Sequence, residues 1–535
     1  MANSPGVYSK EKDLTFAIQS ITSNASAYVG MFRWGPVNEV IDITSNENEL
    51  AQRFGQPDAV VTGFFHAAAN YLLYSVPLSV VRVVGIAAKN AIPQDAKVAG
   101  KTAILVRGVD HLDEVNTDGI SFIGRYPGDL ANTLKVSVSG PTNYATWAYA
   151  DEFEYTPGVG QMNVAIVDED GILTGSAGAV VERYELMTMT PGSKKTDGTS
   201  AYLPEVIKSQ SMYVFVGDPE SIVIDSVTGK YEQSLVDGVD DNDPANADFV
   251  TAWDLFSNTD DADIVRGFTA FNPVEGVIRA IDVFDTRTDA VAFHACELSD
   301  VYNATDRKAN IIEYFTDTIN KPTSYAFQVD NWKLVYDKYN DKNIWIPCDS
   351  DAAGLHARVF VQNEPWFSPA GLNRGQLKNV IRLAWSSNQP DRDILYKYSI
   401  NSIVSFKGEG NVLFGDKTAL MAPSAFRYIN VRTLFIVIRK AISNAARYQL
   451  FELNDFITQS LFRNATDRYL ENVKSRRGIY DKKVVCDSSN NTPQVIDSNE
   501  FVGDVYVKPA RSINVIRLNF IAVGTGVSFE EIEGA

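Results

Sequence analysis

The stretch Ile513-Asn514-Val515-Ile516-Arg517-Leu518-Asn519-Phe520, near the end of this 535-residue chain, decides how the fold is interpreted. Successive side chains of a strand point to opposite faces, so Ile516, Leu518 and Phe520 would share one apolar face. Only a glycine-containing segment and an acidic tail follow this run. The edge of such a terminal strand either pairs inside its own subunit or is donated to a neighbouring subunit.

The beginning of the chain has a similar character. It contains Ser4-Pro5-Gly6 and then short alternating runs such as Thr15-Phe16-Ala17-Ile18-Gln19, which predict extended chain with strand propensity. We therefore expect two arms, residues 1–22 and 511–535. The residues expected to exchange strands are Val7, Tyr8, Phe16, Ile18, Ile513, Val515, Ile516, Leu518 and Phe520.

Between the arms, the C-terminal third contains two helical stripes. One lies in a long helix predicted over Ile429–Leu450, and the other begins at Ile457; stripes at this spacing pack a core. A shorter helix is predicted over Gln376–Ala384, and we assign residues 361–510 to a C-terminal α+β core domain. The stripe residues are Leu434, Ile438, Ala441, Ala445 and Tyr448 in the first helix, and Ile457, Leu461, Ala465, Tyr469 and Val473 in the second.

The preceding part of the chain alternates helix and strand signals. We predict strands over Tyr28–Trp34 and Leu78–Val84, with helices near Glu49–Phe54 and Gly63–Leu73 between them. Further strands are expected at 134–138 and 164–167, and residues 264–350 alternate again. Residues 23–85 and 122–360 are therefore assigned to a middle α/β domain, in which 237–263 form solvated loops around a short helix.

Residues 86–121 differ in composition, being rich in Ala, Lys and Asp. With one expected strand, Ala103–Val106, they are assigned to a small, β-rich outer insertion. The predicted fold class is therefore a multidomain α+β and α/β protein with three folded parts and two arms.

The charge is unevenly distributed over the chain, whose net charge is −19. From residue 351 onward there are 23 lysines and arginines against 18 aspartates and glutamates, whereas the preceding residues hold 25 against 49. A mildly basic end suits contact with an acidic partner, although acidic surfaces also serve solubility alone. The overall acidity argues against nucleic acid as a direct partner.

No run reaches the roughly 18 apolar residues that a membrane span needs, and the N-terminus lacks the pattern of a secretion signal. We expect a protein made in the cytoplasm, without membrane insertion. The three cysteines Cys296, Cys348 and Cys486 are widely spaced. They are interpreted as structural thiols, with a redox or crosslinking role as the alternative.

Residues that carry chemistry are scattered. The four histidines, His66, His111, His294 and His356, have no metal-ligand spacing. The run from Gly410 to Thr418 resembles a phosphate loop, but Asp416 places a carboxylate where phosphate would sit. The acidic run from Asp237 lacks the turn glycine and the final glutamate of a calcium loop. We predict no catalytic, cofactor-binding or metal-binding residue, and no enzyme.

Several motifs without catalytic chemistry resemble those of contractile tail sheath proteins of myovirus-type phages, of the large multidomain type. Each is weak alone, but together they cover most of the chain in the order of that family. They are Ser4-Pro5-Gly6-Val7-Tyr8, Trp34-Gly35-Pro36, Phe54-Gly55-Gln56-Pro57, Tyr126-Pro127-Gly128, the run from Pro365 to Gly375, Arg392-Asp393-Ile394-Leu395-Tyr396, Gly415-Asp416-Lys417-Thr418, the run from Arg427 to Phe435, and Pro509-Ala510-Arg511-Ser512-Ile513-Asn514.

The resemblance implies a structural subunit that forms stacked hexameric rings around an inner tube. The arms would add strands to the C-terminal domains of neighbouring copies, and contraction would drive the tube through the host envelope. The implied partners are further copies of the chain, the tube protein, and baseplate and tail terminator proteins. The protein would be made in the host cytoplasm and reside in the virion, with a reduced outer domain at 86–121.

Two basic groups are candidates for facing the tube. One is the cluster Lys474, Arg476 and Arg477; the other is the helix carrying Arg432, Arg439, Lys440 and Arg447. The alternative for each residue is a solvated helix face. The sheath of a tailocin or extracellular injection system remains the closest rival function, and a soluble α/β enzyme is a rival of a different class.

Overall fold

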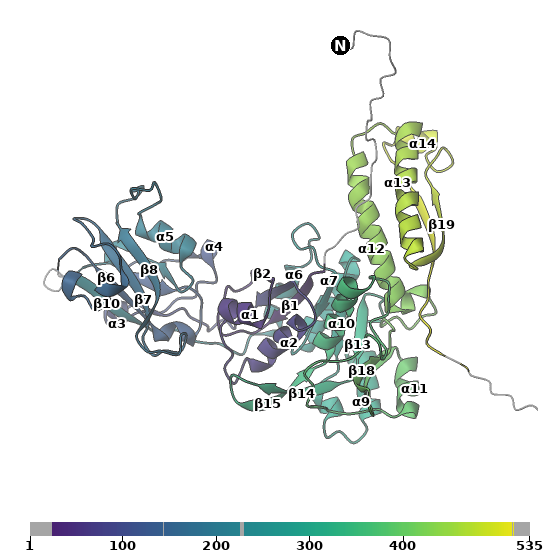
Figure 1. Ribbon diagram of the computed structural model, residues 1–535, viewed down its shortest axis with the longest axis horizontal. Coiled ribbons are helices and arrows are strands. Elements are labelled where there is room, and N and C mark those ends of the chain that lie inside the picture. The colour runs from purple at the N-terminus through teal and green to yellow at the C-terminus, as the bar shows by residue number, and fades with distance from the viewer. Residues whose placement is uncertain (1–23, 143, 225–228, 516, 518–535) are drawn as a thin grey trace, which may run out of the picture. The chain divides into compact units, whose positions relative to one another are not determined.

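The computed structural model describes residues 24–142, 144–224, 229–515 and 517. The chain divides into two compact units, one over Ile18–Leu450 and the other over Met1–Ala17 and Phe451–Ala535. The predicted multidomain architecture with mixed helices and strands is confirmed (Figure 1). Each unit is described separately below.

The larger unit is built on an eight-stranded sheet. Six strands run parallel in its centre, and an antiparallel strand, β2 or β18, lies at each edge. In spatial order the strands are β18 (Gly410–Phe414), β17 (Ile400–Phe406), β13 (Ala326–Val329), β12 (Val291–Ala295), β11 (Arg266–Phe268), β1 (Ser26–Gly30), β3 (Leu78–Arg82) and β2 (Val40–Ile43).

Helices cover both faces of this sheet, as a parallel sheet requires. On one face α2 (Thr62–Leu72) and α10 (Asp349–Gln362) pack together, and on the other α6 (Asn246–Asp254) and α7 (Val274–Arg287) do. The remaining helices of the unit's central part are α1 (Glu47–Phe54), α8 (Leu298–Val301), α9 (Arg307–Glu313), the π-helical turn Tyr314–Ile319, α11 (Gln389–Lys397) and α12 (Ile429–Ala446), which continues as the 3-10 turn Arg447–Gln449.

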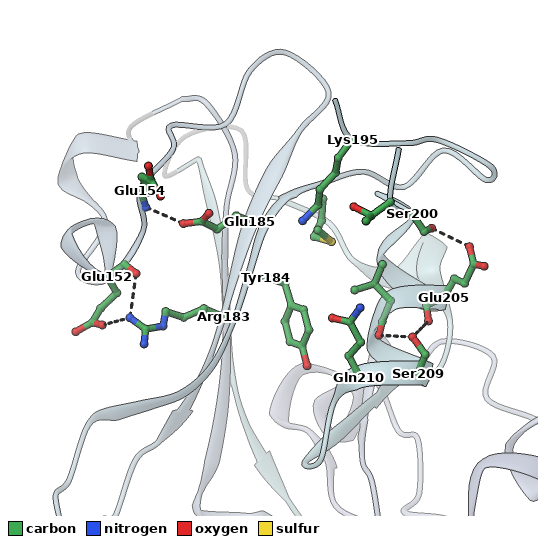
Figure 2. Close-up of a pocket in the computed structure, with 13 residues that line it drawn as sticks. Glu152, Glu154, Arg183, Tyr184, Glu185, Lys195, Ser200, Glu205, Ser209 and Gln210 are labelled. Carbon is green, nitrogen blue, oxygen red and sulfur yellow. Dashed lines mark hydrogen bonds and ion pairs between the residues drawn. The ribbon is translucent and has the colours of Figure 1, made fainter. Parts of the chain in front are cut away.

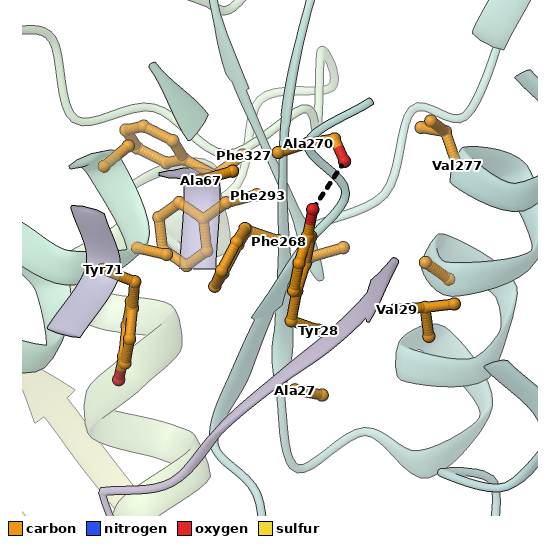
Figure 3. Packing of buried hydrophobic residues seen from close by; sticks show 14 of the residues in the cluster. Ala27, Tyr28, Val29, Ala67, Tyr71, Phe268, Ala270, Val277, Phe293 and Phe327 are labelled. Carbon is orange, nitrogen blue, oxygen red and sulfur yellow. Dashed lines mark hydrogen bonds between the residues drawn. The ribbon is translucent and has the colours of Figure 1, made fainter. Parts of the chain in front are cut away.

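Aromatic rings fill the face beneath α2. Tyr28 stacks on Phe268 with a ring-centroid distance of 4.5 Å, and Phe268 lies 5.5 Å from Tyr71 (Figure 3). The buried Tyr28 hydroxyl donates to carbonyl oxygens of both Phe64 and Ala270, so the ring carries no unsatisfied polar group. On the opposite face Gly267 lies against α7, where an added Cβ would be 2.6 Å from the Phe284 ring.

A small antiparallel sheet extends one side of this core. Its order is β15 (Lys342–Pro347), β14 (Trp332–Asp337) and β16 (Arg382–Leu383). Lys333 of β14 is fully buried, and its Nζ donates to Asp351 Oδ1 of α10 at 2.9 Å and to Asn70 Oδ1 of α2 at 2.7 Å. One buried ammonium therefore connects two helices with the small sheet.

A β-rich portion is inserted between β3 and α6. Its main sheet is antiparallel, and Figure 1 shows β6, β7, β8 and β10 of this sheet together. The sheet order is β4 (Ile92–Pro93), β10 (Lys230–Val236), β6 (Leu134–Ser139), β7 (Met162–Asp168) and β8 (Ala179–Met187); beside it lie the pair β5 (Phe122–Gly124) and β9 (Val214–Val216) and the helices α3 (Gln94–Val98), α4 (Val109–Leu112) and α5 (Leu203–Gln210).

Arg82, the last residue of β3, joins this portion to the central sheet. Its buried guanidinium donates to the carbonyl oxygens of Phe32 at 2.7 Å, Gly35 at 2.8 Å and Pro127 at 2.8 Å. Burial lowers its pKa to about 10. Phe32 follows β1 of the central sheet, and Pro127 belongs to the inserted portion. One side chain therefore ties the inserted portion to the loop that follows β1.

The C-terminal unit contains two helices and two strands within its described residues. The long helix α13 (Phe456–Ser475) packs on an antiparallel pair, β19 (Ile479–Val485) and β20 (Asp504–Pro509). The short helix α14 (Pro493–Asp497) lies in the loop between these strands.

The sheets do not follow the domain boundaries drawn from the sequence. Strands as far as residue 236 share sheets with the segment 86–121, which was predicted as an outer insertion. β17 and β18, from the segment predicted as the C-terminal domain, complete the central sheet. The domain boundaries themselves stay a prediction. Strand signals alone do not show which sheet a strand joins.

Two predicted elements are wrong. Residues 376–384 are not helical, because their backbone pairs with two strands: Leu377 N donates to Asn411 O and Ile381 N to Leu334 O, each at 2.9 Å. Ala103–Val106 is not a strand, because Asn90 binds this segment through its side chain, which accepts from Val106 N at 2.7 Å.

Removing Asp351 should strongly destabilise the larger unit. In the Asp351→Ala variant, Lys333 stays buried without its counter-charge, and we expect a loss of about 3–5 kcal/mol in urea unfolding. The double variant Lys333→Met/Asp351→Leu should lose less than the single variant. The exposed pair Arg447–Asp260 is the control, and Asp260→Ala should cost under about 1 kcal/mol. Equal losses for Asp351→Ala and Asp260→Ala would show that Lys333 does not depend on Asp351 for its counter-charge.

Asp330, which follows β13, should make stability depend on pH. Burial raises its pKa to about 7, although Ile403 N donates to its Oδ1 at 2.9 Å. The unfolded state has already lost this proton by about pH 5, whereas the folded state keeps it up to about pH 7. Stability therefore falls as pH rises to the folded pKa and levels off above it. Asp330→Asn should remove about 2–3 kcal/mol of that fall, measured as variant-minus-wild-type unfolding free energy.

Asp168 gives the matched control. Burial opposes ionisation there, but hydrogen bonds from Thr133, Leu173 and Thr174 outweigh it and lower its pKa. The carboxylate is then ionised in both states across this pH range, so the Asp168→Asn difference should stay constant. A constant difference for Asp330→Asn as well would refute the raised pKa.

Candidate assembly surfaces

Within the described residues of the C-terminal unit, α13 covers one side of the sheet. Lys482 of β19 reaches α13, where its Nζ lies 2.5 Å from Asp467 Oδ1 and 3.3 Å from Glu471 Oε2. The neighbouring Asp481 instead pairs across the strands with the exposed Lys508 at 3.0 Å. The hydrogen bond from Lys508 lowers the pKa of Asp481. One face of the pair is thus bound to the helix, and the other carries exposed charges.

Both edges of this sheet are open in the part of the chain that the structure describes. β19 pairs with β20 alone, so each strand has one side of its backbone without a strand partner. A two-stranded sheet is marginally stable alone, and α13 supplies the packing that supports it. Open edges present N–H and C=O groups that can pair with a further strand.

The loop between the two strands is held rigidly. Asn491 is buried, and its Nδ2 donates to Val502 O at 2.8 Å while its Oδ1 accepts from Val502 N at 2.9 Å. Asn490 donates to Val485 O at 2.9 Å and to Asp504 Oδ2 at 3.0 Å. These amide side chains fix the ends of β19 and β20, but the sequence did not single them out, because lone asparagines in a polar loop carry no distinguishing pattern.

The predicted strand-exchange residues lie mostly outside the described residues. This holds for Val7, Tyr8, Phe16, Ile18, Ile516, Leu518 and Phe520. Ile513 and Val515 are described; they lie beyond β20, are not in a strand, and have exposed side chains. The role of the nine residues in exchange therefore stays a prediction.

The basic residues of α12 contact their own unit. Arg432 is buried, lies over the rings of Tyr325 and Phe426 at 4.3 and 4.0 Å, and donates to Ser324 Oγ at 2.6 Å. The other three side chains also have partners: Arg439 donates to Arg287 O, Lys440 pairs with Asp263 and Asp289, and Arg447 pairs with Asp260. These contacts hold α12 in place and give Arg432 a structural role.

The basic cluster at the end of α13 has a different environment. The side chains of Lys474 and Arg477 are exposed, whereas Arg476 is half-buried. Arg477 has a φ of 66°, which places it in the turn that ends the helix. Cations at the end of a helix are favoured by its macrodipole, so this cluster is an electrostatically stable basic surface.

Two sequence motifs together anchor α12. In the motif 415–418, Lys417 N donates to Asn401 Oδ1 at 2.8 Å, and Thr418 N donates to Arg427 O at 2.8 Å. Ile429 N, at the start of α12, donates to Asp416 O at 2.9 Å. Burial lowers the pKa of Lys417 to about 8. The run that resembled a phosphate loop therefore holds the start of α12 in place through backbone hydrogen bonds.

A segment that we name the strap, residues 371–377, covers the outer edge of β18. Gly371 N donates to Leu413 O at 2.9 Å, and Leu413 N donates to Gly375 O at 2.8 Å. Gly371 has a φ of 93°, a conformation that glycine adopts without strain. The strap overlaps the motif 365–375 at residues 371–375, so this motif helps to close one edge of the central sheet.

The histidines and cysteines are either buried or hydrogen-bonded within the fold. His356 accepts from Arg266 Nε at 3.0 Å and lies 2.9 Å from Thr433 Oγ1, while burial lowers the pKa of His294 to about 3. His66 lies 3.0 Å from Asp337, and His111 accepts from Arg107 N at 3.2 Å. Cys296, Cys348 and Cys486 are buried free thiols, and burial raises the pKa of Cys486 to about 11.

A cavity of about 540 Å³ lies beside β8 and α5 (Figure 2). Its charged lining residues include Glu152, which pairs with Arg183 at 2.9 Å, and Glu205, which accepts from Ser200 at 2.9 Å. Its lining contains neither histidine nor cysteine.

Across the described ranges, no group of three metal-binding side chains comes together. No described helix has both the length and the hydrophobicity of a membrane span.

Known proteins show where this arrangement occurs. A family model of the phage tail sheath C-terminal domain matches residues 421–522. The tail sheath protein of Salmonella phage ViI is 32% identical, covering 99% of this chain and 97% of that protein. That of Enterobacteria phage T4 is 30% identical, covering 99% of both chains.

Solved structures share the fold. The sheath tail protein of Listeria innocua has a TM-score of 0.56 and 12% identity, covering 91% of this chain and 94% of that chain. The sheath of an extracellular contractile injection system in its contracted state has a TM-score of 0.52 and 14% identity, covering 99% of both. Because the identities of 30–32% extend over nearly the full length of phage tail sheath proteins, this chain belongs to the family of phage tail sheath proteins, structural subunits of contractile tails.

Proposed function

We propose that this chain polymerises as stacked hexameric rings around an inner tail tube, and that the cylinder contracts to drive the tube through the host cell envelope. The observation that carries the proposal is the two-stranded sheet β19–β20, whose edges are open within the described residues. Arms from neighbouring copies would add strands to these edges and join the subunits into a mesh. A head-to-tail contact that does not close on itself generates a helical cylinder.

Strand addition suits a moving assembly. Main-chain hydrogen bonds between strands survive while the bulk of each subunit rotates, because the arms act as tethers. Contraction is then a rigid-body repacking of subunits. The extended cylinder holds its energy behind a kinetic barrier until it is triggered.

The expected partners follow from this role. They are further copies of the chain, the inner tube protein, and baseplate and tail terminator proteins at the ends of the cylinder. The protein would be made in the host cytoplasm and carried in the virion tail. In a tailocin or extracellular injection particle the same mechanics would serve a different machine. Genes for a capsid and for DNA packaging beside this gene would favour the phage.

Self-assembly is tested by negative-stain electron microscopy of the purified, overexpressed protein. We expect hollow cylinders with helical striations, because strand addition at open edges has no built-in end point. Deleting residues 511–535 should leave a folded chain that forms no cylinders. Uniform small particles of the intact chain at every concentration would overturn the proposal and favour an enzyme or a simple binding module.

The basic cluster after α13 is the preferred tube-facing surface. Contacts that break during sliding should be electrostatic and moderate, and the exposed Lys474 and Arg477 suit this better than the buried Arg432 does. The variant Lys474→Glu/Arg477→Glu should reduce assembly on tubes by about tenfold or more, with greater loss at low salt.

The control for this variant is Lys194→Glu/Lys407→Glu, which makes the same change in charge at two other exposed lysines. Co-sedimentation with purified tubes measures both variants. Equal assembly of the two would exclude the cluster as a tube contact.

A further inference from the structure

The apolar stripe of α13 is longer than the sheet that it packs against. Its C-terminal members Ala465, Tyr469 and Val473 are buried, as the sequence predicts. Its first two members are not: Ile457 is 66% exposed and Leu461 is 43% exposed. The predicted core role is therefore wrong for these two residues.

The exposed part of the stripe belongs to a larger surface. We define the apolar patch as Phe451, Leu453, Phe456, Ile457 and Leu461, five large apolar side chains within eleven residues, all exposed. Single exposed apolar residues are common on protein surfaces, but several large ones concentrated in one short segment indicate an interaction site.

The surrounding contacts explain why the patch stays uncovered by its own unit. The sheet binds the C-terminal half of α13, where Lys482 meets Asp467 and Glu471. The loop between the strands covers a different side of the N-terminal half, where Phe501 packs on the buried Phe462 with ring centroids 5.4 Å apart. Among the described residues of the unit, the first turns of α13 thus keep an apolar side exposed.

The two ends of α13 differ in chemistry and suit different partners. The apolar patch lies at the N-terminal end and the basic cluster at the C-terminal end, with about 20 Å of helix between Leu461 and Lys474 at 1.5 Å per residue. A surface along which a tube slides needs contacts that break easily, whereas burial of large aliphatic and aromatic side chains gives a lasting contact. The apolar patch therefore suits a partner that stays bound during contraction.

We infer that the apolar patch is buried against a second copy of this chain in the polymer. The patch belongs to the same compact unit as the open edges of β19–β20, at which arms from other copies are expected, so a copy bound at those edges is within reach of the patch. The inference rests on the proposed polymerisation. It adds a specific surface and a nonpolar, permanent mode of contact.

The test uses the full-length chain with Ile457→Asp/Leu461→Asp. The matched control is Asn464→Asp/Asn472→Asp, which adds the same charge at two other positions of the same helix, both polar and exposed. We expect the patch variant to raise the critical concentration for sedimentable polymer by about tenfold or more, because it places charges in an apolar contact. The control should polymerise like the wild type, and both variants should keep the wild-type Tm.

A second measurement locates the partner. An environment-sensitive dye on Ile457→Cys labels selectively, because all three native cysteines are buried. Its emission should shift to the blue only at concentrations at which the chain sediments, whereas a dye on Asn472→Cys should not respond. A shift at every concentration, with a lowered Tm for the patch variant, would show that residues 24–450 of the same chain cover the patch and would overturn the inference.

The remaining outcomes separate the two proposals. If the patch variant and the control polymerise like the wild type, the patch inference fails and the polymerisation proposal stands. If the wild type never sediments, the polymerisation proposal fails and the patch inference fails with it.

Discussion

Burial of both faces of the parallel sheet is the constraint to which most features of the larger unit respond. Parallel strands expose no face to water, so α2 and α10 cover one side and α6 and α7 the other. Polar groups inside these layers must then find partners, as Lys333 does with Asp351 and Asn70. The strap meets the same demand at the edge, where it satisfies the backbone of β18.

Local pattern predicted many elements but not their membership of sheets. The strands at 134–138 and 164–167 and the helix from Ile429 lie where the sequence places them, because alternation and helical stripes are local properties. Which sheet a strand joins depends on partners far along the chain, so the pattern of a single segment does not reveal its sheet. The segment 376–384 contains residue types that favour a helix, but its backbone forms hydrogen bonds with β18 and β14. Tertiary pairing outweighs propensity there.

The assembly surfaces were predictable to different degrees. The basic cluster at Lys474 was visible as a charge pattern, and the structure leaves two of its members exposed. For α12, the same kind of pattern misled: Arg432 is buried among aromatic rings, which no charge count reveals. Ile457 and Leu461 of the apolar patch were assigned to the core, because a helical stripe looks the same in the sequence whether its residues are buried or exposed. Buried Asn491 left no pattern at all.

The pairing of β1 with β11 sets an order of events during synthesis. Ser26 lies beside Arg266 in the sheet, and Tyr28 lies beside Phe268. About 240 residues of chain must therefore be synthesised after β1 before β11, its partner on this side, exists. The β-rich portion lies wholly within that interval, and its own sheet pairs residues no farther apart than β4 and β10. It can therefore complete its folding on the ribosome while β1 remains unpaired on the side that β11 will occupy. Once the β-rich portion has folded, the connection between β1 and β11, which is very long in sequence, is short in space.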